Sequence, residues 1–395
     1  MRCKRRDLLF PLVSPRAGPR RWAMIAVLVV AGMGNAIAAV PIPKPPSVDG
    51  RAYILIDSGS GRTLADLNAD QRMEPASLTK LMTGYAVFMA LKEKRLSLQD
   101  PVTISERAWR AEGSRTFVQV GDQVPAEILI KGMIVQSGND ATIALAEKVG
   151  GTEDAFAQLM NSYAKRLGMK NSNFTNSTGL PDPNLYVTPR DMATLSRAII
   201  REFPTYYRWY SEREFVWNNI RQQNRNGLLG RDPSVDGIKT GHTETAGYCL
   251  ATSAERNGMR LISVVFGSAS MKAREDASAA LLNYGYTFYE TVKIRSRGDV
   301  VLKPRLYKGE DETVAAVASR DIVVTVGRGT GAALKTSASA TDPLVAPLAA
   351  NQTIGELVVS DGAEVVARIA LVPAKAVAAG GLWSRLTDTI ALWMR

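Results

Sequence analysis

The apolar residues between Leu81 and Leu91 recur so densely that they cover nearly the whole circumference of a helix. A helix that is apolar all round is buried in a core rather than laid on a surface. Pro75 lies just upstream, and a proline at a helix start costs no hydrogen bond. We therefore predict a buried central helix that begins near Pro75, with the rest of its domain packed around it.

Shorter runs on both sides of this helix predict a sheet and further helices. Strand patterns cover residues 52–57, 62–67, 235–239, 248–254 and 260–266. Helical patterns cover residues 126–135, 140–148, 153–167, 189–201 and 273–289. Strands first, helices in the middle, and strands with a helix last indicate an α/β (α+β) domain over residues 45–292, in which helices pack on a sheet.

The pattern changes after residue 292. Short alternating runs at 300–302, 322–326, 354–359 and 365–372 are separated by Gly, Asp, Ser and Pro. Such a pattern is typical of a small all-β domain, which we assign to residues 293–373. An Ala/Gly-rich stretch at 374–381 then predicts a linker.

The last segment, residues 382–395, has the pattern of an amphipathic helix. Six large apolar residues fall within an arc of about 120° on a helical wheel. They are Leu382, Trp383, Leu386, Ile390, Trp393 and Met394. A segment of this length is too short to span a bilayer, which takes about 20 residues, and its apolar face and tryptophans favour a helix lying in a membrane interface. A helix docked on the β domain, or a dimer contact, is the alternative.

The N-terminus has the layout of a secretory signal peptide over residues 1–38. Basic residues precede an apolar stretch at 22–33, and a small-x-small cleavage motif ends at Ala38. A retained membrane anchor is the alternative. This leader carries seven basic residues and one acidic residue, so the formal charge of +11 falls to +5 without it. Nucleic-acid binding is therefore not expected. Cys249 is the one cysteine outside the leader, and we expect it to be buried in a strand.

Ser77 and Lys80 are the first candidates for chemistry. Three residues apart on a helix, the two side chains share a face and can touch. A serine hydroxyl becomes a strong nucleophile when a neighbouring base takes its proton, and a lysine can be that base once burial and a nearby cation lower its pKa. The motif is weak alone, since Ser162 and Lys165 repeat it on what we expect to be a surface helix.

Two further clusters contain polar residues next to glycine. Ser137 and Asn139 flank a glycine between two helices, where they could line a cleft or simply cap the second helix. Lys239, Thr240 and Gly241 follow a strand. The glycine would let a substrate backbone lie close, while the lysine and threonine could bind a carboxylate. The alternative is a strand that ends in a glycine turn.

The sequence excludes several other kinds of site. His242 is the single histidine, so a Ser-His-Asp hydrolase would have to use it, but the Gly-x-Ser-x-Gly motif of many such enzymes is absent. We expect His242 to pack beside the Lys239 strand. The sequence has neither the His/Cys cluster of a zinc site nor a Gly-rich phosphate loop, so we expect neither a metal nor an organic cofactor.

The order of the three motifs is far more specific than any one of them. Ser-x-x-Lys, Ser-x-Asn and Lys-Thr-Gly, in that order, are the motif set of penicillin-recognising serine enzymes. The chain resembles the D-alanyl-D-alanine carboxypeptidases among the low-molecular-mass penicillin-binding proteins. Residues 75–80, 136–141, 224–229 and 235–248 carry the likeness. The resemblance runs from about residue 52 to the C-terminus.

The resemblance implies a β-lactamase-like antiparallel sheet with packed helices and assigns catalytic roles. Ser77 would be the acyl-enzyme nucleophile and Lys80 its proton acceptor. Ser137 would relay a proton to the leaving D-alanine, and Asn139 would line the cleft. The middle motif here is Ser-Gly-Asn, whereas class A β-lactamases have Ser-Asp-Asn.

The resemblance also implies a set of substrate-binding residues. Lys239 and Thr240 would bind the terminal carboxylate beside Gly241, and the backbone N–H groups of Ser77 and His242 would form the oxyanion hole. Arg225 would border the site.

Several features argue against a β-lactamase. The stretch between the second and third motifs contains no obvious deacylating glutamate, although Glu147, Glu153 and Glu202 lie there. The extra β domain points the same way.

We therefore expect a serine carboxypeptidase that removes the last D-alanine from peptidoglycan stem pentapeptides and binds β-lactam antibiotics. It would lie peripherally on the periplasmic face of the inner membrane. A D,D-endopeptidase and a non-catalytic cell-wall scaffold are the alternatives.

Overall fold

The computed structural model describes residues 41–395, so the predicted signal peptide at 1–38 lies outside the described residues. Its first layer is a five-stranded sheet in which every neighbouring pair is antiparallel. The strand order is β2 (Thr63–Leu67), β1 (Ala52–Asp57), β9 (Met259–Ser268), β8 (Gly247–Arg256) and β7 (Val235–Thr243). β7 is thus an edge strand of this sheet.

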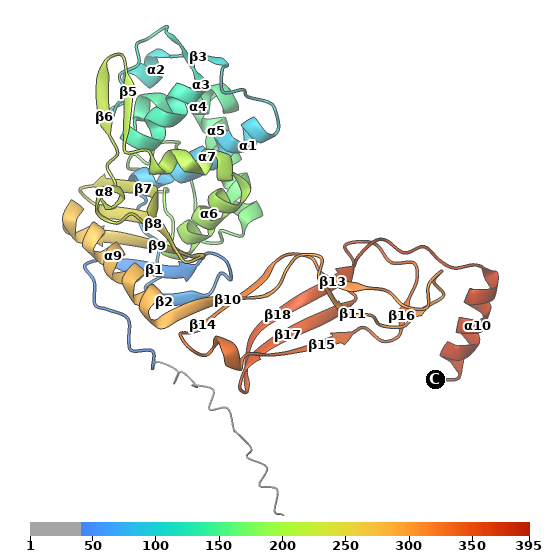
Figure 1. The fold of residues 1–395 in the computed structure, drawn as a ribbon. Coiled ribbons are helices and arrows are strands. Elements are labelled where there is room, and N and C mark those ends of the chain that lie inside the picture. Colours follow the sequence, from blue (N-terminus) through green and yellow to red (C-terminus); the bar gives the residue numbers. More distant parts are fainter. Residues whose placement is uncertain (1–40) are drawn as a thin grey trace, which may run out of the picture. The chain divides into compact units, whose positions relative to one another are not determined.

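The sheet separates two apolar cores because successive residues of a strand point to opposite faces. On β1, Ile54 and Ile56 join the core around α1 (Lys80–Lys92), whereas Leu55 joins the core under α9 (Met271–Phe288). In Figure 1, α9 lies along one face of the sheet, and α1 and α6 (Pro189–Glu202) lie on the other. Helices therefore cover both faces of the sheet, and the predicted fold class is confirmed.

Helices and hairpins fill the region between β2 and β7. The longer elements are α3 (Ala126–Lys131), the π turn η2 (Gly132–Gln136), α4 (Asn139–Gly150) and α5 (Glu153–Leu167). The shorter helices are α2 (Glu106–Trp109), α7 (Pro204–Tyr207) and α8 (Leu228–Arg231). Two antiparallel strand pairs complete the region: β3 (Pro101–Thr103) with β4 (Gln123–Pro125), and the hairpin of β5 (Glu214–Trp217) and β6 (Ile220–Gln223). The predicted bounds of α5 are confirmed, because Thr152 accepts a hydrogen bond from Ala155 at its start and Gly168 ends it in a left-handed conformation.

Two segments differ from the sequence-based expectation. The strand expected to end at Lys239 continues to Thr243, because residues 239–243 pair in full with β8. Residues 335–340, which lie outside the strand patterns of the sequence, form β15 (Lys335–Ala340) at the edge of another sheet. The sequence did not predict this strand, because it consists mainly of Ser and Ala, which have low strand propensity.

The C-terminal part of the chain is a set of β-strands around its own apolar core. Its main sheet has the order β11 (Val300–Leu302), β13 (Ala316–Ala318), β18 (Glu364–Pro373), β17 (Gly355–Asp361) and β15. The predicted boundary after residue 292 falls inside β10 (Tyr289–Arg295), which pairs with β14 (Ile322–Gly327). The stretch expected as a linker is tied to this domain, because Val377 pairs with Leu348 and Ala379 with Gly309.

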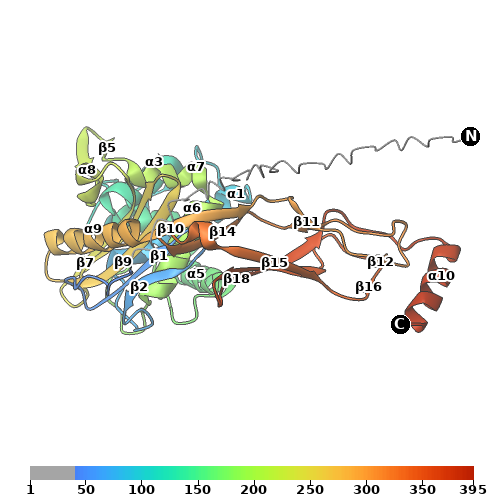
Figure 2. The same ribbon diagram turned by 60° about the horizontal axis from the view of Figure 1, so that its bottom comes forward.

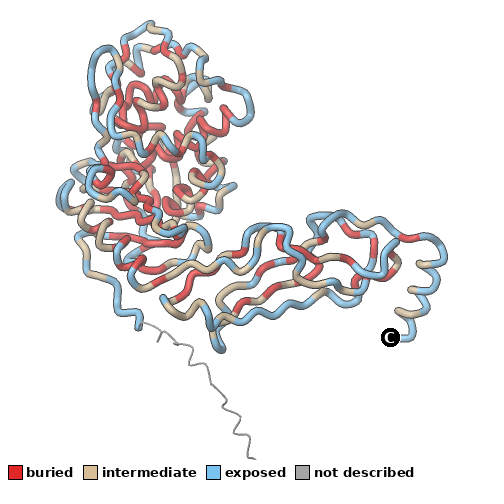
Figure 3. Tube along the Cα trace, viewed as in Figure 1, coloured by how far each residue is buried: buried red, intermediate tan, exposed pale blue. Residues whose placement is uncertain are grey.

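The last helix, α10 (Leu382–Trp393), lies beside β12 (Leu306–Tyr307). Figure 2 shows it near the labels of β12 and β16, and Figure 3 shows that it is exposed along its length, unlike the buried α1. The backbone N–H of Lys308 donates to Asp388, and Ser384 donates to the carbonyl of Gly309. α10 therefore contacts the domain through its polar face. No helix among residues 41–395 combines the length and the apolar character that a membrane crossing needs.

Candidate active site

Ser77 and Lys80 lie at the start of the central helix, where the sequence predicts them. Ser77 belongs to the short 3₁₀ turn η1 (Ala76–Thr79), and Lys80 is the first residue of α1. Twelve of the thirteen residues of α1 are buried, including Lys80. The ammonium nitrogen Nζ of Lys80 lies 3.1 Å from Ser77 Oγ. The predicted contact between the two side chains is therefore present in the folded chain.

Three acceptors surround Lys80 Nζ. Besides Ser77 Oγ, the nitrogen donates to Asn139 Oδ1 at 2.6 Å and to the carbonyl of Thr178 at 2.7 Å. A neutral amine has two N–H donors and one lone pair. The two shorter contacts satisfy the two donors, so the lone pair is left for the Ser77 hydroxyl proton.

The electrostatic environment favours that neutral form. Burial is the largest cause that lowers the pKa of Lys80, and the positive charge of Arg225 is the next, while Asp140 and Glu153 oppose the shift. The pKa falls from 10.5 to about 7. At neutral pH a large fraction of Lys80 is therefore able to accept a proton.

The second motif follows the π turn that ends α3. Ser137 has a left-handed backbone, with φ of 66°, and its buried hydroxyl has no hydrogen-bond partner among residues 41–395. Asn139 begins α4 and uses its side chain to bridge Lys80 and the carbonyl of Glu112, the latter at 2.5 Å. Within the described chain, neither side chain caps α4. The structure therefore does not support the capping alternative, and it places Ser137 on the wall of the cavity beside Ser77.

Asp140 holds the loop that forms the opposite wall of the cleft. Its buried carboxylate accepts from the backbone N–H groups of Thr116, at 2.7 Å, and Phe117, at 2.9 Å. The loop before Thr116 carries Gly113 and Ser114 on the wall of the cavity beside Ser77. The residue after the second motif thus fixes a wall of the site, a role that the sequence analysis did not assign.

The third motif lies within β7 rather than after it. Gly241 is required for packing: a Cβ atom there would lie 3.1 Å from the carbonyl oxygen of Pro75 and 3.2 Å from the nitrogen of Ser77. The close approach that the glycine permits is thus to the chain's own nucleophile segment. His242 is exposed, and its ring stacks on Tyr248 with the centroids 4.0 Å apart. Cys249 is buried in β8, as expected.

One cavity of about 610 Å³ joins the three motifs. Its walls include Ser77, Ser137, Arg225, Thr240, Gly241, His242, Tyr248 and Arg274. Of the third motif's two polar residues, Thr240 lines this cavity and Lys239 does not. The buried Nζ of Lys239 donates to the carbonyl of Thr240 at 3.1 Å. Burial, followed by the charges of Lys80, Arg225 and Arg274, lowers the pKa of Lys239 well below its usual value. The structure thus places Lys239 behind the wall.

Arg274 is a functional candidate that the sequence analysis missed. It is 3% exposed, and it donates to the carbonyls of Gly241, at 3.1 Å, and Arg225, at 3.3 Å. Its Nε has no partner among residues 41–395. On α9 it occupies the same buried stripe as Ala277 and Leu281. A charged residue at a core position of a helix is unusual, and this is the signal that could have identified it.

The other motif matches lie outside the site. Ser162 and Lys165 are exposed on α5, as expected. Lys335 and Thr336 lie on β15 of the C-terminal domain. Across residues 41–395, no group of three or more His, Cys, Asp or Glu residues is arranged to hold a metal ion.

Comparison with known proteins gives two family matches and a set of close relatives. A model described as D-alanyl-D-alanine carboxypeptidase matches residues 39–270, and a model of the penicillin-binding protein 5 C-terminal domain matches residues 289–379. The D-alanyl-D-alanine carboxypeptidase DacA of Haemophilus influenzae is 42% identical over 89% of this chain and 91% of the relative. DacA of Escherichia coli is 41% identical over 89% of each chain.

A solved structure supports the same relationship. Penicillin-binding protein 5 of Haemophilus influenzae superposes with a TM-score of 0.80 at 42% identity, over 85% of this chain and 99% of that one. The motif order, the contact between Ser77 and Lys80, and these matches agree. The chain belongs to the D-alanyl-D-alanine carboxypeptidase family of serine peptidases.

Proposed function

We propose that Ser77 is the nucleophile that attacks the penultimate D-alanine carbonyl of a peptidoglycan stem peptide, and that Lys80 is its base. The observation that carries this proposal is the position of Lys80 Nζ, 3.1 Å from Ser77 Oγ and held by two other acceptors. A base fixed in this way loses little side-chain entropy on reaching the transition state.

The acylation step follows from these contacts. Lys80 takes the proton of the Ser77 hydroxyl as Oγ forms a bond to the substrate carbonyl carbon. The negative charge that develops on the carbonyl oxygen is stabilised by the backbone N–H groups of Ser77 and His242. As the C–N bond breaks, Ser137 donates its hydroxyl proton to the leaving D-alanine nitrogen and takes up the proton that Lys80 removed from Ser77, so that Lys80 is neutral again. A water molecule then gives a proton to Lys80 as its oxygen bonds to the acyl carbon. When the ester C–O bond breaks, Ser77 Oγ takes that proton back from Lys80 and the shortened peptide is released.

The walls of the cavity suit a substrate that ends in a carboxylate. Arg225 and Arg274 supply positive charge, and Thr240 supplies a hydroxyl. We assign Lys239 an indirect role, because its buried head donates to the carbonyl of Thr240 from behind the wall. This wall fits the free carboxyl group of a terminal D-alanine.

Mass spectrometry of the protein after treatment with penicillin tests the assignment. A β-lactam presents a strained amide next to a carboxylate, so we expect one adduct, on Ser77. An adduct on Ser137 or Ser162 with Ser77 unmodified would refute it. Purified muropeptides provide the second measurement: a carboxypeptidase releases free D-alanine from pentapeptides, whereas an endopeptidase splits crosslinked dimers.

We further propose that the protein acts on the periplasmic face of the inner membrane, with α10 lying in the interface. The leader-like composition of residues 1–38 supports export. The six apolar residues of the predicted arc are between 51% and 88% exposed, while Asp388 and Ser384 bond the β domain. The helix thus presents to its surroundings the apolar face that a bilayer interface would accept.

A further inference from the structure

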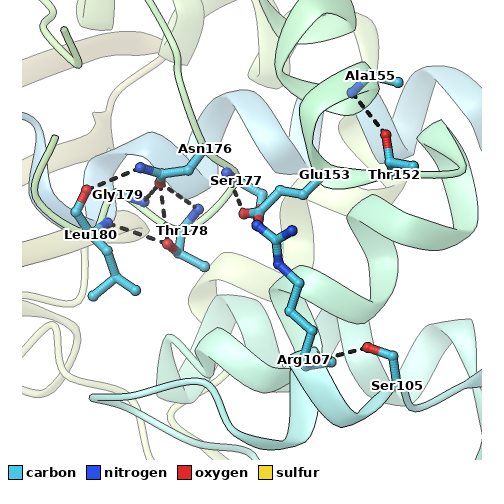
Figure 4. Close-up of polar contacts among 11 residues, drawn as sticks. Ser105, Arg107, Thr152, Glu153, Ala155, Asn176, Ser177, Thr178, Gly179 and Leu180 are labelled. Carbon is cyan, nitrogen blue, oxygen red and sulfur yellow. Dashed lines mark hydrogen bonds and ion pairs between the residues drawn. The ribbon is translucent and has the colours of Figure 1, made fainter.

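Glu153 has an environment that is unusual for the first residue of a helix. Its side chain is only 5% exposed. Oε1 accepts from the backbone N–H of Ser177 at 3.0 Å and from its hydroxyl at 2.6 Å. Oε2 pairs at 2.5 Å with Arg107, whose side chain is 60% exposed. Figure 4 shows the carboxylate between these two partners. These donors fix the carboxylate in place.

Ser177 belongs to the 176–180 turn, which contacts the proposed catalytic pair directly. The carbonyl of Thr178 accepts from Lys80 Nζ at 2.7 Å, and the carbonyl of Ser177 accepts from Thr83, one turn further along α1, at 2.6 Å. Gly179 lies against the segment of the nucleophile, because a Cβ atom there would come within 1.8 Å of the carbonyl oxygen of Ala76. A movement of this turn would therefore move the base relative to Ser77.

The 176–180 turn is also closed on itself. Asn176 Oδ1 accepts from the backbone N–H of Thr178 at 3.2 Å and from that of Gly179 at 2.7 Å, and Asn176 Nδ2 donates to the carbonyl of Leu180 at 3.0 Å. Figure 4 shows this set of bonds around Asn176. The turn is thus a small rigid unit, and Glu153 attaches it to α5.

We propose that Glu153 is a positioning residue for acylation, whose carboxylate holds the 176–180 turn so that the Thr178 carbonyl fixes Lys80 toward Ser77. This inference rests on the proposed role of Lys80 as the base. It adds a residue outside the three motifs, 73 positions after Lys80 in the sequence.

The charge of Glu153 acts on the base as well. Three charged groups act on Lys80: Asp140 and Glu153 are negative, and Arg225 is positive. Lys239 is also near enough for the two lysines to interact. Glu153 opposes the fall in the Lys80 pKa that burial and Arg225 cause. Removal of its charge should therefore lower that pKa further, and a smaller fraction of Lys80 would be protonated at a given pH.

The test is the pH profile of acylation by a fluorescent penicillin, measured on the full chain between about pH 5.5 and 9. Glu153→Gln keeps the shape and an oxygen acceptor for Ser177 but removes the charge. In this variant we expect the pH at which the acylation rate rises to be lower by about half a unit. The maximal acylation rate at high pH should stay within about twofold of wild type. Glu153→Ala should shift the pH at which the rate rises similarly and lower the maximal rate at least about tenfold, because the Ser177 donors lose their acceptor.

Ser177→Ala is the matched control, since it removes one donor and leaves the charge. In this variant the acylation rate should rise at the same pH as in wild type. The inference is overturned if the rate also rises at the wild-type pH in both Glu153 variants, because a purely structural change lowers the maximal rate without changing the pH at which the rate rises. If Glu153→Ala does not fold, as judged by thermal unfolding, Glu153→Gln alone carries the test.

A parallel Lys80→Arg variant separates this inference from the proposed function. Arginine stays protonated, so the variant should not be acylated. If it is labelled normally, the base assignment fails and the role of Glu153 falls with it. If it is inert while both Glu153 variants keep the wild-type profile, only the Glu153 inference fails.

Discussion

Gly179→Ala should disable the site through the backbone alone. Gly179 has φ of +84°, and an added Cβ would lie 1.8 Å from the carbonyl oxygen of Ala76. The ordinary C···O contact is about 3.3 Å or longer, so the two backbones must separate by roughly 1.5 Å. The left-handed conformation costs an alanine about 1–2 kcal/mol, and the clash adds to this, so we expect a loss of at least about 3 kcal/mol. The separation would also break the bond between Thr178 and Lys80.

Gly168→Ala is the control for this prediction. Gly168 has a similar φ of +78°, but a Cβ there meets nothing within 4 Å. This variant should lose only about 1 kcal/mol, which corresponds to a melting temperature about 2–4 °C lower, and it should acylate normally. Gly179→Ala should melt at least about 6 °C lower and acylate at least about tenfold more slowly. Equal melting temperatures for the two variants, or wild-type acylation by Gly179→Ala, would refute the reasoning.

Three further predictions follow from other parts of the chain. Because the pKa of Lys80 is about 7, the second-order rate constant of acylation should rise as the pH rises through about 7. A rate constant that does not change between about pH 6 and 8 would contradict the assignment of Lys80 as the base. Asp140→Ala leaves the N–H groups of Thr116 and Phe117 without their acceptor, so it should cost about 2–4 kcal/mol in urea unfolding and slow acylation, whereas unchanged stability would show that the loop does not depend on Asp140. Truncation after Ala378 should release the protein from membranes in a sedimentation assay, while cleavage of small D-Ala-D-Ala peptides persists. If the truncated protein still sediments with membranes, α10 is not the anchor. If it unfolds, α10 belongs to the core.

Local patterns were enough to predict the elements and the pairing of the first motif. The apolar circumference of α1 predicted its burial, and the spacing of Ser77 and Lys80 predicted a contact that the fold brings to 3.1 Å. Both properties depend on residues within one or two helical turns, where geometry is fixed by the backbone itself. The hairpin β5–β6 was missed, although Asn218 and Asn219 at its turn both have positive φ, which asparagine tolerates better than most residues.

Other contacts of the site could not be predicted, because they join distant parts of the chain. Thr178 bonds Lys80 across 98 positions, and Arg274 reaches Gly241 across 33. No periodicity or motif records such a pairing, because it arises only when two separately folded elements pack together. Lys239 shows the same dependence on packing. Its type suggests a direct contact with a carboxylate, which stays a prediction, and in the folded chain its buried head donates to the carbonyl of Thr240.

A lysine that folds in its neutral form also has a thermodynamic consequence for the whole chain. In the unfolded chain the pKa of Lys80 is near 10.5, and in the folded chain it is about 7. Between these values the unfolded chain binds one more proton, so the free energy of unfolding rises as the pH rises through this window, and at neutral pH it is lower by up to about 5 kcal/mol. The apolar burial along α1 has to offset that loss. Lys80→Met should therefore raise the free energy of unfolding while removing the base. At this one nitrogen, the group that catalysis requires lowers the stability of the fold.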